Sequence, residues 1–205
     1  MAWAVTARAA ELFNFGATWK YLVGTNEASS PDVQAWRLPA FDDSAWASGT
    51  APIGYANPPN HPSEEALVTL LPSSAEANYL SVFFRKSFVV PNAGNISNLE
   101  LDVNVDDGFV AWINGKEVGR FNVPDGELAY NSTASSTGEP TLVTLAVTNG
   151  LGAILTSGAN VLAVQVFNSS TSSSDLLLDA SLSSDADVTP PTVLEVVPAP
   201  GSTVT

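Results

Sequence analysis

The chain has 205 residues, and its 21 acidic side chains against 7 Lys and Arg give a formal net charge of −14. This balance disfavours nucleic acid and anionic membrane surfaces as partners, because both are themselves negatively charged. The sequence has no Cys and only 1 His, which excludes disulfide scaffolds, thiolate zinc sites, Cys nucleophiles and multi-His metal sites.

Several connections between the predicted elements are long. Residues 25–34, 56–66, 71–78 and 123–140 contain most of the Pro, Asn and Ser. No amphipathic helix of ordinary length is found, and residues 64–71 allow about two helical turns at most. Because long loops in a compact β-domain are usually functional or mobile, these segments are candidates for a binding site.

The clearest strand signal comes from alternating residues in the middle of the chain. Leu99, Leu101, Val103 and Val105 alternate with Glu100, Asp102, Asn104 and Asp106. Such strict alternation predicts a half-buried antiparallel strand. The dipeptides Asp107-Gly108 and Asn114-Gly115 tolerate the positive φ of a tight hairpin. We therefore expect a three-stranded meander over residues 99–121, with a hairpin at each dipeptide.

Three further strand-like runs follow, at Leu142–Thr148, Val161–Phe167 and Leu176–Leu182. Short strands separated by Gly, Pro, Asn and Ser predict an all-β sandwich or barrel. No apolar stretch approaches the roughly 18 residues of a membrane span, so membrane insertion is not expected.

The composition changes near the C-terminal end. Residues 183–191 are rich in Ser, Asp and Pro, which is typical of a linker, and Thr192–Val197 then has the pattern of a new strand. We expect one β-domain over residues 1–183, and a linker with the start of a following domain over 184–205. The N-terminus lacks the features of a signal peptide. The chain is therefore interpreted as a piece of a longer protein, secreted or on the cell surface, whose signal peptide lies outside it.

The sequence shows no catalytic constellation. Adjacent carboxylates occur at Asp42-Asp43, Glu64-Glu65 and Asp106-Asp107, but neighbours on a strand point to opposite faces, so adjacency is evidence against a glycosidase pair. A Ser–His–Asp triad would require His61, and no Gly-x-Ser-x-Gly motif accompanies it. We expect a protein that is not an enzyme.

Metal binding through oxygen ligands stays open. A calcium site built from scattered carboxylates and backbone carbonyls leaves no spacing signature. Asp42 and Asp43 lie in a predicted turn, and Asp179 lies on the polar face of the last predicted strand. The alternative for Asp179 is a solvated side chain facing water.

Aromatic and cationic side chains complete the candidates. Trp19, Trp36, Trp46 and Trp112 have apolar neighbours and are predicted in the core. Trp112 is expected inside the sandwich or against its edge. The aromatic residues at predicted strand ends or in loops either stack on a sugar ring or cover the edge of the core; they are Tyr55, Tyr79, Tyr130 and Phe167. Arg85 and Arg120 are expected to pair with a carboxylate or with an anionic ligand.

A series of motifs resembles a known family. Over residues 12–183 the chain resembles the galactose-binding-domain-like jelly rolls attached to bacterial secreted glycosidases, esterases and CotH-type proteins. The segments that carry the resemblance are Trp19–Tyr21, Trp36, Phe41–Trp46, Ala51–Tyr55, Phe83–Phe88, Val105–Gly115, Asn160–Val166 and Ser173–Leu176. It implies an antiparallel jelly-roll β-sandwich with about eight to ten strands. The tail after Thr189 resembles the start of a bacterial Ig-like domain.

The resemblance also implies two functional features. Related modules often hold a structural calcium between an early acidic turn and the last strand, which corresponds here to Asp42 or Asp43 and Asp179. They bind sugars either in loops at one end of the sandwich or on a sheet face. A non-catalytic carbohydrate-binding module is therefore expected, acting as a monomer beside other domains of the same chain. The alternative is a structural spacer with no sugar ligand.

The sugar site is predicted at the loop end formed by residues 56–66, 123–130 and 168–175. These loops gather stacking surface and hydrogen-bonding groups from Tyr55, Asn57, His61, Tyr130, Asn168 and Asp175. With few cations in the chain, the expected ligand is a neutral polysaccharide or oligosaccharide. The competing interpretation is that residues 168–175 only close a strand connection. The sheet face bearing Glu100, Asp102 and Asn104 is the next candidate.

Overall fold

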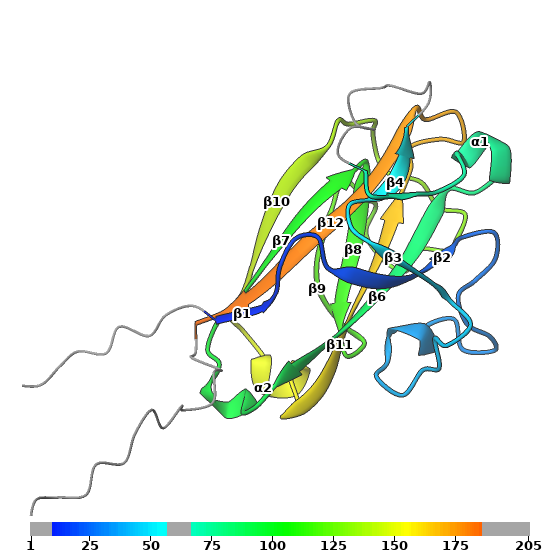
Figure 1. Cartoon of the computed structure of the whole chain (residues 1–205). Helices are drawn as coiled ribbons and strands as arrows, with labels where there is room; N and C mark the ends of the chain where they lie inside the picture. Colours follow the sequence, from blue (N-terminus) through cyan, green and yellow to red (C-terminus); the bar gives the residue numbers. More distant parts are fainter. Residues whose placement is uncertain (1–9, 57–66, 186–205) are drawn as a thin grey trace, which may run out of the picture.

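The computed structural model describes residues 10–56 and 67–185, which form two sheets packed face to face (Figure 1). The first sheet contains, in spatial order, β10 (Thr141–Val147), β7 (Leu99–Asp106), β12 (Asp175–Ser184), β4 (Ile53–Ala56) and β5 (Thr69–Leu70), and β1 (Ala10–Phe13) also pairs with β12. The second contains β3 (Ala47–Thr50), β2 (Thr18–Val23), β6 (Ser81–Val90), β11 (Gly158–Phe167), β8 (Gly108–Ile113) and β9 (Lys116–Phe121). Every described pairing is antiparallel except β4 with β5.

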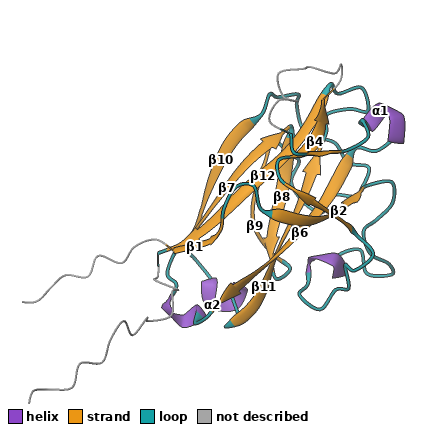
Figure 2. Cartoon of the chain, in the orientation of Figure 1, coloured by secondary structure: helices purple, strands orange, loops and turns teal. Residues whose placement is uncertain are grey.

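Short helical turns occupy the connections between strands (Figure 2). They are η1 (Ala35–Arg37), α1 (Ser74–Ala77), η3 (Ala93–Asn95) and α2 (Leu151–Ile154). Among the described residues, no helix has the length and apolar character that a membrane crossing requires. Because the described helical segments are only short turns between strands, the predicted all-β class is confirmed.

The order of the main strands is that of a jelly roll. From β6 to β12 the chain passes to the other sheet at each connection, except between β8 and β9, which are neighbours in the second sheet. This places β4, β12, β7 and β10 opposite β6, β11, β8 and β9, the two four-stranded layers of a jelly-roll sandwich. The described residues contain twelve strands, more than the about eight to ten expected, because short strands such as β1, β3 and β5 flank the main ones.

The main core lies between the two sheets and follows the alternation of the sequence. Leu99, Leu101, Val103 and Val105 of β7 are at most 1% exposed and belong to this core. The inward residues of β12 are Leu176, Leu178, Ala180 and Leu182, and they are all 0% exposed. The runs predicted at 142–148, 161–167 and 176–182 are confirmed as β10, β11 and β12.

The two predicted hairpins have different outcomes. Asn114-Gly115 connects the paired strands β8 and β9, and both residues have positive φ, 51° and 82°. Asp107-Gly108 is not a hairpin: β7 pairs with β10 and β12, whereas β8 pairs with β9 and β11 in the other sheet. The predicted meander over 99–121 is therefore wrong in its first half. A Cβ at Gly108 would lie 2.7 Å from the Asn122 carbonyl oxygen, so this glycine permits a close backbone approach where the chain changes sheets.

A second, smaller core covers the outer face of the second sheet. Trp112 and Phe83 point outward from their strands and contact Trp36 of the η1 turn, with ring centroids 5.6 and 5.0 Å apart. Every residue of β8 is buried, because both of its faces are covered. Trp112 is therefore buried as predicted, but beneath a loop rather than inside or at the edge of the sandwich.

Arg85 fastens this loop to the sheet. Its Nε donates to Asp43 Oδ2 at 2.7 Å, and its Nη1 donates to the carbonyl oxygens of Trp36 and Leu38. The side chain is 3% exposed. The ion pair and the carbonyl contacts therefore offset the cost of burying the guanidinium charge. Arg120 also pairs with a carboxylate, that of Glu117, at 2.7 Å.

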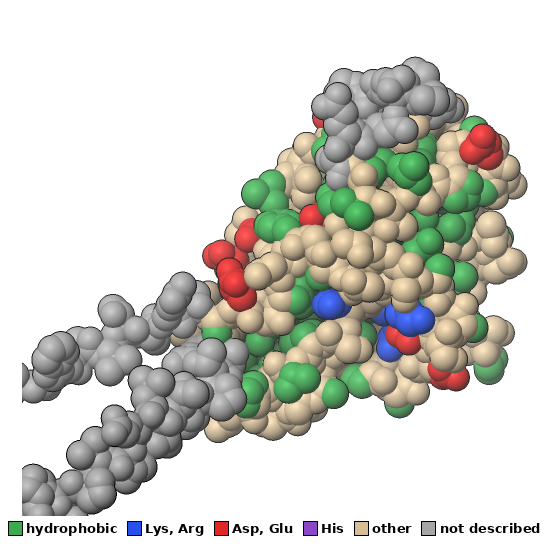
Figure 3. Space-filling view, in the orientation of Figure 1, with side chains coloured by type: hydrophobic (Ala, Val, Ile, Leu, Met, Phe, Trp, Pro, Cys, Tyr) green, Lys and Arg blue, Asp and Glu red, His purple; other side chains and the backbone are tan. Residues whose placement is uncertain are grey.

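Charged side chains are unevenly distributed over the surface. Figure 3 shows Asp and Glu at several separate places on one face, and Lys and Arg in two patches near its middle, the larger of which has an acidic side chain beside it.

Candidate functional site: a polar pocket at the loop end

One end of the sandwich carries a polar pocket with a volume of about 480 Å³. It is lined by Asp107, Thr137, Gly138, Glu139, Ser169, Ser170, Ser172, Ser173, Ser174 and Asp175. Hydroxyl and carboxylate groups dominate this lining, and it contains no aromatic residue. The size falls within the usual range of small-ligand sites, and the chemistry is that of a surface that hydrogen-bonds rather than stacks.

The jelly-roll connections bring these segments together. β7 ends at Asp106, β12 begins at Asp175, and Glu139 precedes β10, which pairs with β7. These three strands are neighbours in the first sheet, so their ends meet at one edge. The connection from β11 to β12, residues 168–174, closes the other side.

Asp107 holds both walls of the pocket. Its Oδ1 accepts a hydrogen bond from the backbone N–H of Gly138 at 2.6 Å, and its Oδ2 accepts one from the N–H of Ser169 at 2.7 Å. Its own carbonyl oxygen accepts from Asn122 Nδ2 at 3.1 Å. Sequence reasoning assigned Asp107 to a hairpin turn and missed this role, because the two partners are 31 and 62 residues away.

Asp106 lies behind the pocket in an unusual state. Its side chain is 0% exposed, and neither carboxylate oxygen has a hydrogen-bond partner in the described structure. Burial raises the pKa of Asp106 to about 8, and the charges of Asp175, Asp107 and Glu139 act in the same direction. Asp106 is therefore protonated at neutral pH.

Two of the predicted sugar contacts are interior residues. The Tyr55 ring is 3% exposed and belongs to the main core. Its hydroxyl lies 2.7 Å from Ser74 Oγ, donates to the Ser173 carbonyl oxygen at 3.2 Å, and accepts from Asn168 Nδ2 at 2.8 Å. Asn168 is 0% exposed. Tyr55 and Asn168 thus support the loop of residues 168–174 from behind, and burial raises the pKa of the Tyr55 hydroxyl.

The remaining predicted sugar contacts are distributed differently. Asp175 lines the pocket, is 5% exposed, and accepts a hydrogen bond from Ser174 Oγ at 3.0 Å. Tyr130 does not line it: its backbone N–H donates to Glu27, and its carbonyl oxygen accepts from Ser81 Oγ at 2.7 Å. Asn57 and His61 lie outside the described residues.

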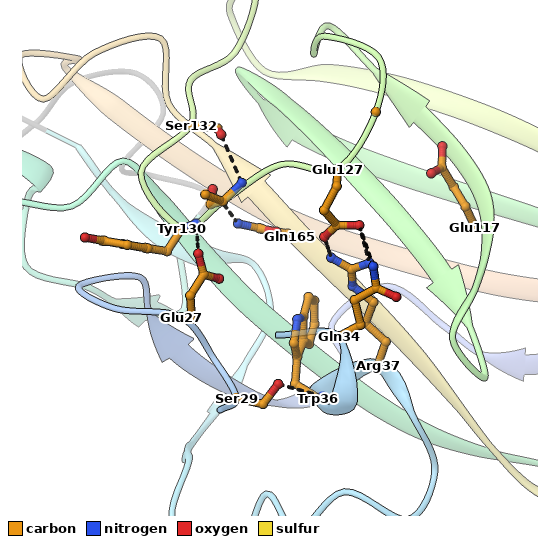
Figure 4. A network of polar contacts seen from close by, with 12 residues as sticks. Glu27, Ser29, Gln34, Trp36, Arg37, Glu117, Glu127, Tyr130, Ser132 and Gln165 are labelled. Atoms are coloured by element: carbon orange, nitrogen blue, oxygen red, sulfur yellow. Dashed lines mark hydrogen bonds and ion pairs between the residues drawn. The ribbon is translucent and has the colours of Figure 1, made fainter. Parts of the chain in front are cut away.

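Tyr130 belongs to a separate polar network on the outer face of the second sheet (Figure 4). There Arg37 pairs with Glu127, and Gln34 donates to the same carboxylate at 3.1 Å. The Arg37 guanidinium carbon lies 3.9 Å from the centroid of the Trp112 ring, a cation–π contact. Because Arg37 is 4% exposed, this network closes the second core rather than presenting a cation to solvent.

The carboxylates predicted to hold calcium, Asp42 or Asp43 together with Asp179, lie in different parts of the structure. Asp43 pairs with Arg85 on the outer side of the second sheet, and the exposed Asp42 accepts from the N–H of Ser44. Asp179 belongs to the first sheet, where its two oxygens accept from the N–H of Gly16 at 3.0 and 3.2 Å. Within residues 10–56 and 67–185, no group of three or more His, Cys, Asp or Glu side chains is arranged to hold a metal ion.

Comparison with known proteins relates the fold to larger enzymes. Neither protein-family models nor curated proteins gave a match. Among solved structures, the chain is similar to a β-glucuronidase of Bacteroides uniformis, with a TM-score of 0.52 and 18% identity over 86% of this chain and 18% of that one. Bacteroides uniformis β-glucuronidase 2 covalently bound to cyclophellitol-6-carboxylate aziridine gives a TM-score of 0.51 and 17% identity, with the same coverage of 86% and 18%. A glycosyl hydrolase family 2 member from Bacteroides cellulosilyticus DSM 14838 gives 0.49 and 15%, covering 86% of this chain and 20% of that one.

At identities of 18% and 17%, the first two likenesses establish the fold. The chain spans about a fifth of the length of these solved structures, since it covers 18% of the first. The class that the fold defines is an antiparallel β-sandwich domain.

Proposed function

We propose that the chain is a non-catalytic carbohydrate-binding module of a larger secreted bacterial protein, and that the loop-end pocket takes a neutral polysaccharide or oligosaccharide. The observation that carries the proposal is the lining of this pocket by Ser hydroxyls together with Asp107, Glu139 and Asp175. Carboxylates accept hydrogen bonds from sugar hydroxyls, and Ser hydroxyls either donate or accept. Support also comes from the occurrence of the fold within solved glycosidase structures.

The charge of the pocket favours a neutral ligand. Three carboxylates line it and no Lys or Arg does, so a uronate or sulfate would be repelled. The lining has no aromatic ring on which a sugar could stack, so the affinity depends on hydrogen bonds alone. Each hydrogen bond to the sugar replaces one to water, and the affinity is therefore expected to be weak. Weak binding is sufficient for targeting, because a tethered partner domain gains a high local concentration of substrate.

We favour a binding role over glycosidase chemistry at this pocket. A carboxyl group with a raised pKa is suited to general acid catalysis, and Asp106 has such a pKa. However, the Asp106 side chain is fully buried and is not part of the pocket lining. A general acid must come within hydrogen-bond reach of the leaving group. A binding role is therefore favoured over a catalytic one.

A spacer function is the second candidate, and one observation favours it. Tyr55 and Asn168 already explain the course of residues 168–174 as a strand connection, and Ser170 and Ser172 bond to each other at 3.0 Å. A loop that satisfies its own polar groups needs no ligand.

Glu139→Ala is expected to weaken binding of a neutral polysaccharide about tenfold, the cost of one hydrogen bond to a charged group. Glu139 is exposed at the rim of the pocket, so its removal should leave the fold intact. Affinity electrophoresis with soluble galactan, xyloglucan and laminarin first identifies a binding polymer, and calorimetry then compares the variants.

Glu100→Ala is the matched control, because it removes the same charge from an exposed position on β7, far from the loop end. An equal loss of affinity in both variants would move the site to the sheet face of Glu100, Asp102 and Asn104. If the parent protein binds no polymer of a broad neutral panel, the spacer function replaces the proposal.

A further inference from the structure

The loop-end pocket gathers negative charge without a cation in its lining. Asp107, Glu139 and Asp175 contribute carboxylates to it, and no Lys or Arg does. The Glu139 side chain is exposed at the rim. Its backbone carbonyl oxygen accepts from Thr141 Oγ1 at 2.8 Å, whereas its carboxylate has no partner among the residues that the structure describes. This carboxylate is therefore available to a ligand.

A fourth carboxyl group lies on the same side of the first sheet as the pocket. Val105 of β7 and Leu176 of β12 point into the main core. Side chains alternate between the faces of a strand, so their neighbours Asp106 and Asp175 both point to the outer face. Asp106 pairs with Leu177 across the two strands, two residues from Asp175. Such diagonal neighbours lie about 7–8 Å apart, which places Asp106 beside the pocket lining.

The surroundings of Asp106 indicate that a positive charge is missing at this end. Its side chain is 0% exposed, and both carboxylate oxygens lack a hydrogen-bond partner within the described ranges. Buried polar groups without partners are rare and cost free energy. After burial itself, the charges of Asp175, Asp107 and Glu139 are the causes that raise its pKa, so the carboxylates of the pocket act on Asp106. A cation bound in the pocket would relieve this repulsion.

The arrangement suits an ammonium group better than a metal ion. A calcium ion requires six to eight oxygens at about 2.3–2.6 Å, and no three acidic side chains of residues 10–56 and 67–185 converge in that way. An ammonium group needs only acceptors at ordinary hydrogen-bond distances, and it has three donors to share among them. The carboxylates and Ser hydroxyls spread over the lining provide such acceptors.

We propose that the loop-end pocket binds a polysaccharide that carries free amino groups, with the ammonium group of one amino sugar beside Glu139. This inference rests on the proposed function, in which the pocket takes a polysaccharide without anionic groups, and it specifies that one sugar of the ligand is cationic. Hydrogen bonds between an ammonium group and a carboxylate are stronger than those between neutral groups. The net charge of −14 also attracts such a polymer at long range. An N-acetylated sugar has the same ring without the charge and should bind more weakly.

Calorimetric titration compares the hexamer of β-1,4-linked glucosamine with its fully N-acetylated form, at pH 5.5 and 0.15 M NaCl. Amines are protonated at this pH, and charges more than about 8 Å apart are largely screened at this salt concentration. We expect the amino hexamer to bind about fivefold more tightly or better. Glu139→Gln retains a hydrogen-bond acceptor without the charge, and it should remove about this fivefold preference.

Glu100→Gln is the matched control, because it removes the same charge from an exposed position on β7 that is not part of the pocket lining. It should change the affinity for either hexamer by less than about twofold, the effect of a distant and screened charge. The four affinities of the parent and Glu139→Gln for the two hexamers form a double-mutant cycle, which isolates the contact between the ammonium group and the Glu139 carboxylate.

Several results would overturn the proposal. It fails if neither hexamer binds, if the two bind equally, or if Glu100→Gln weakens binding of the amino hexamer as much as Glu139→Gln does, since the overall charge would then be the cause. It fails in its ligand class if millimolar calcium chloride displaces the amino hexamer, because the pocket would then serve a metal ion. A neutral polymer whose binding is weakened by Glu139→Ala leaves the proposed function standing even where the amino hexamer gains nothing, and only the present inference is then lost.

Discussion

Gly54→Ala is expected to prevent stable folding. A Cβ at this position would lie far inside 3.0 Å from the Leu176 carbonyl oxygen, a separation below which real Cβ contacts do not fall. Gly54 of β4 pairs with Leu177 of β12, and β12 is held on its other side by β7. The backbone of β12 therefore has no room to retreat, and closely packed interiors do not absorb such an overlap.

The expected loss in the free energy of unfolding is about 4 kcal/mol or more, which is comparable with the total stability of an ordinary domain. Circular dichroism during urea unfolding measures it, together with the yield of soluble protein. Gly152→Ala is the control: it lies in α2, and a Cβ there would meet nothing within 4 Å. That variant should match or slightly exceed the parent in stability. A Gly54→Ala protein that unfolds at the parental urea concentration would show that β4 and β12 do not approach as described.

Asp106→Asn is expected to stabilise the protein at alkaline pH. The pKa of Asp106 is about 8 in the folded state, against 3.8 for an ordinary Asp. Between these two values the unfolded chain has released a proton that the native state retains, so stability falls as pH rises through this window. Below this pH window Asp106 is protonated in both the folded and the unfolded state. Above it Asp106 is ionised in both states, and the cost of burying the carboxylate no longer changes with pH. Asn resembles the protonated carboxyl group and does not ionise, so it removes this dependence of the free energy of unfolding on pH.

Urea unfolding at pH 4, 6 and 8.5 measures this difference. We expect equal stability of the two proteins at pH 4 and a gain of about 2–3 kcal/mol for Asp106→Asn at pH 8.5, since one unit of pKa corresponds to about 1.4 kcal/mol and part of the shift is relieved by local relaxation. Asp125→Asn makes the same charge change at an exposed position and should leave the pH profile parallel to that of the parent. Parallel profiles for Asp106→Asn as well would show that Asp106 is ionised at neutral pH and has partners.

The parts of the fold that local sequence determines were predictable. Alternation in Leu99–Val105 defines a strand with one face in the core, because side chains on a strand alternate between faces. Asn114-Gly115 defines a turn, because both positions need positive φ. Asp107-Gly108 has the same appearance, yet it joins strands of different sheets. Which partner a strand takes depends on distant segments, and no dipeptide encodes that choice.

The candidate site was less predictable for the same reason. The sequence predicts Tyr55 at a strand end or in a loop, and it lies near the end of β4, but its pairing with Leu176 turns the ring into the main core. Asp106 and Asp107 are adjacent, which argued against a shared role. The change of sheet after Asp106 puts one carboxyl behind the pocket and the other into its lining. The only sequence signal for these two residues was a pair of acidic residues at the end of a buried strand. Acidic residues that merely face solvent show the same pattern.

The pairing of β1 with β12 has a consequence for how such a module works on a longer chain. Ala10 and Ser184 are partners in this pairing, so the polypeptide enters and leaves the sandwich at neighbouring points (Figure 1). β12 runs from Asp175 in the loop-end pocket to Ser184, ten residues or roughly 30 Å. The chain therefore enters and leaves the described sandwich at the opposite end of β12 from the loop-end pocket. Under the proposed function, this arrangement leaves the pocket facing away from any segment attached before β1 or after β12.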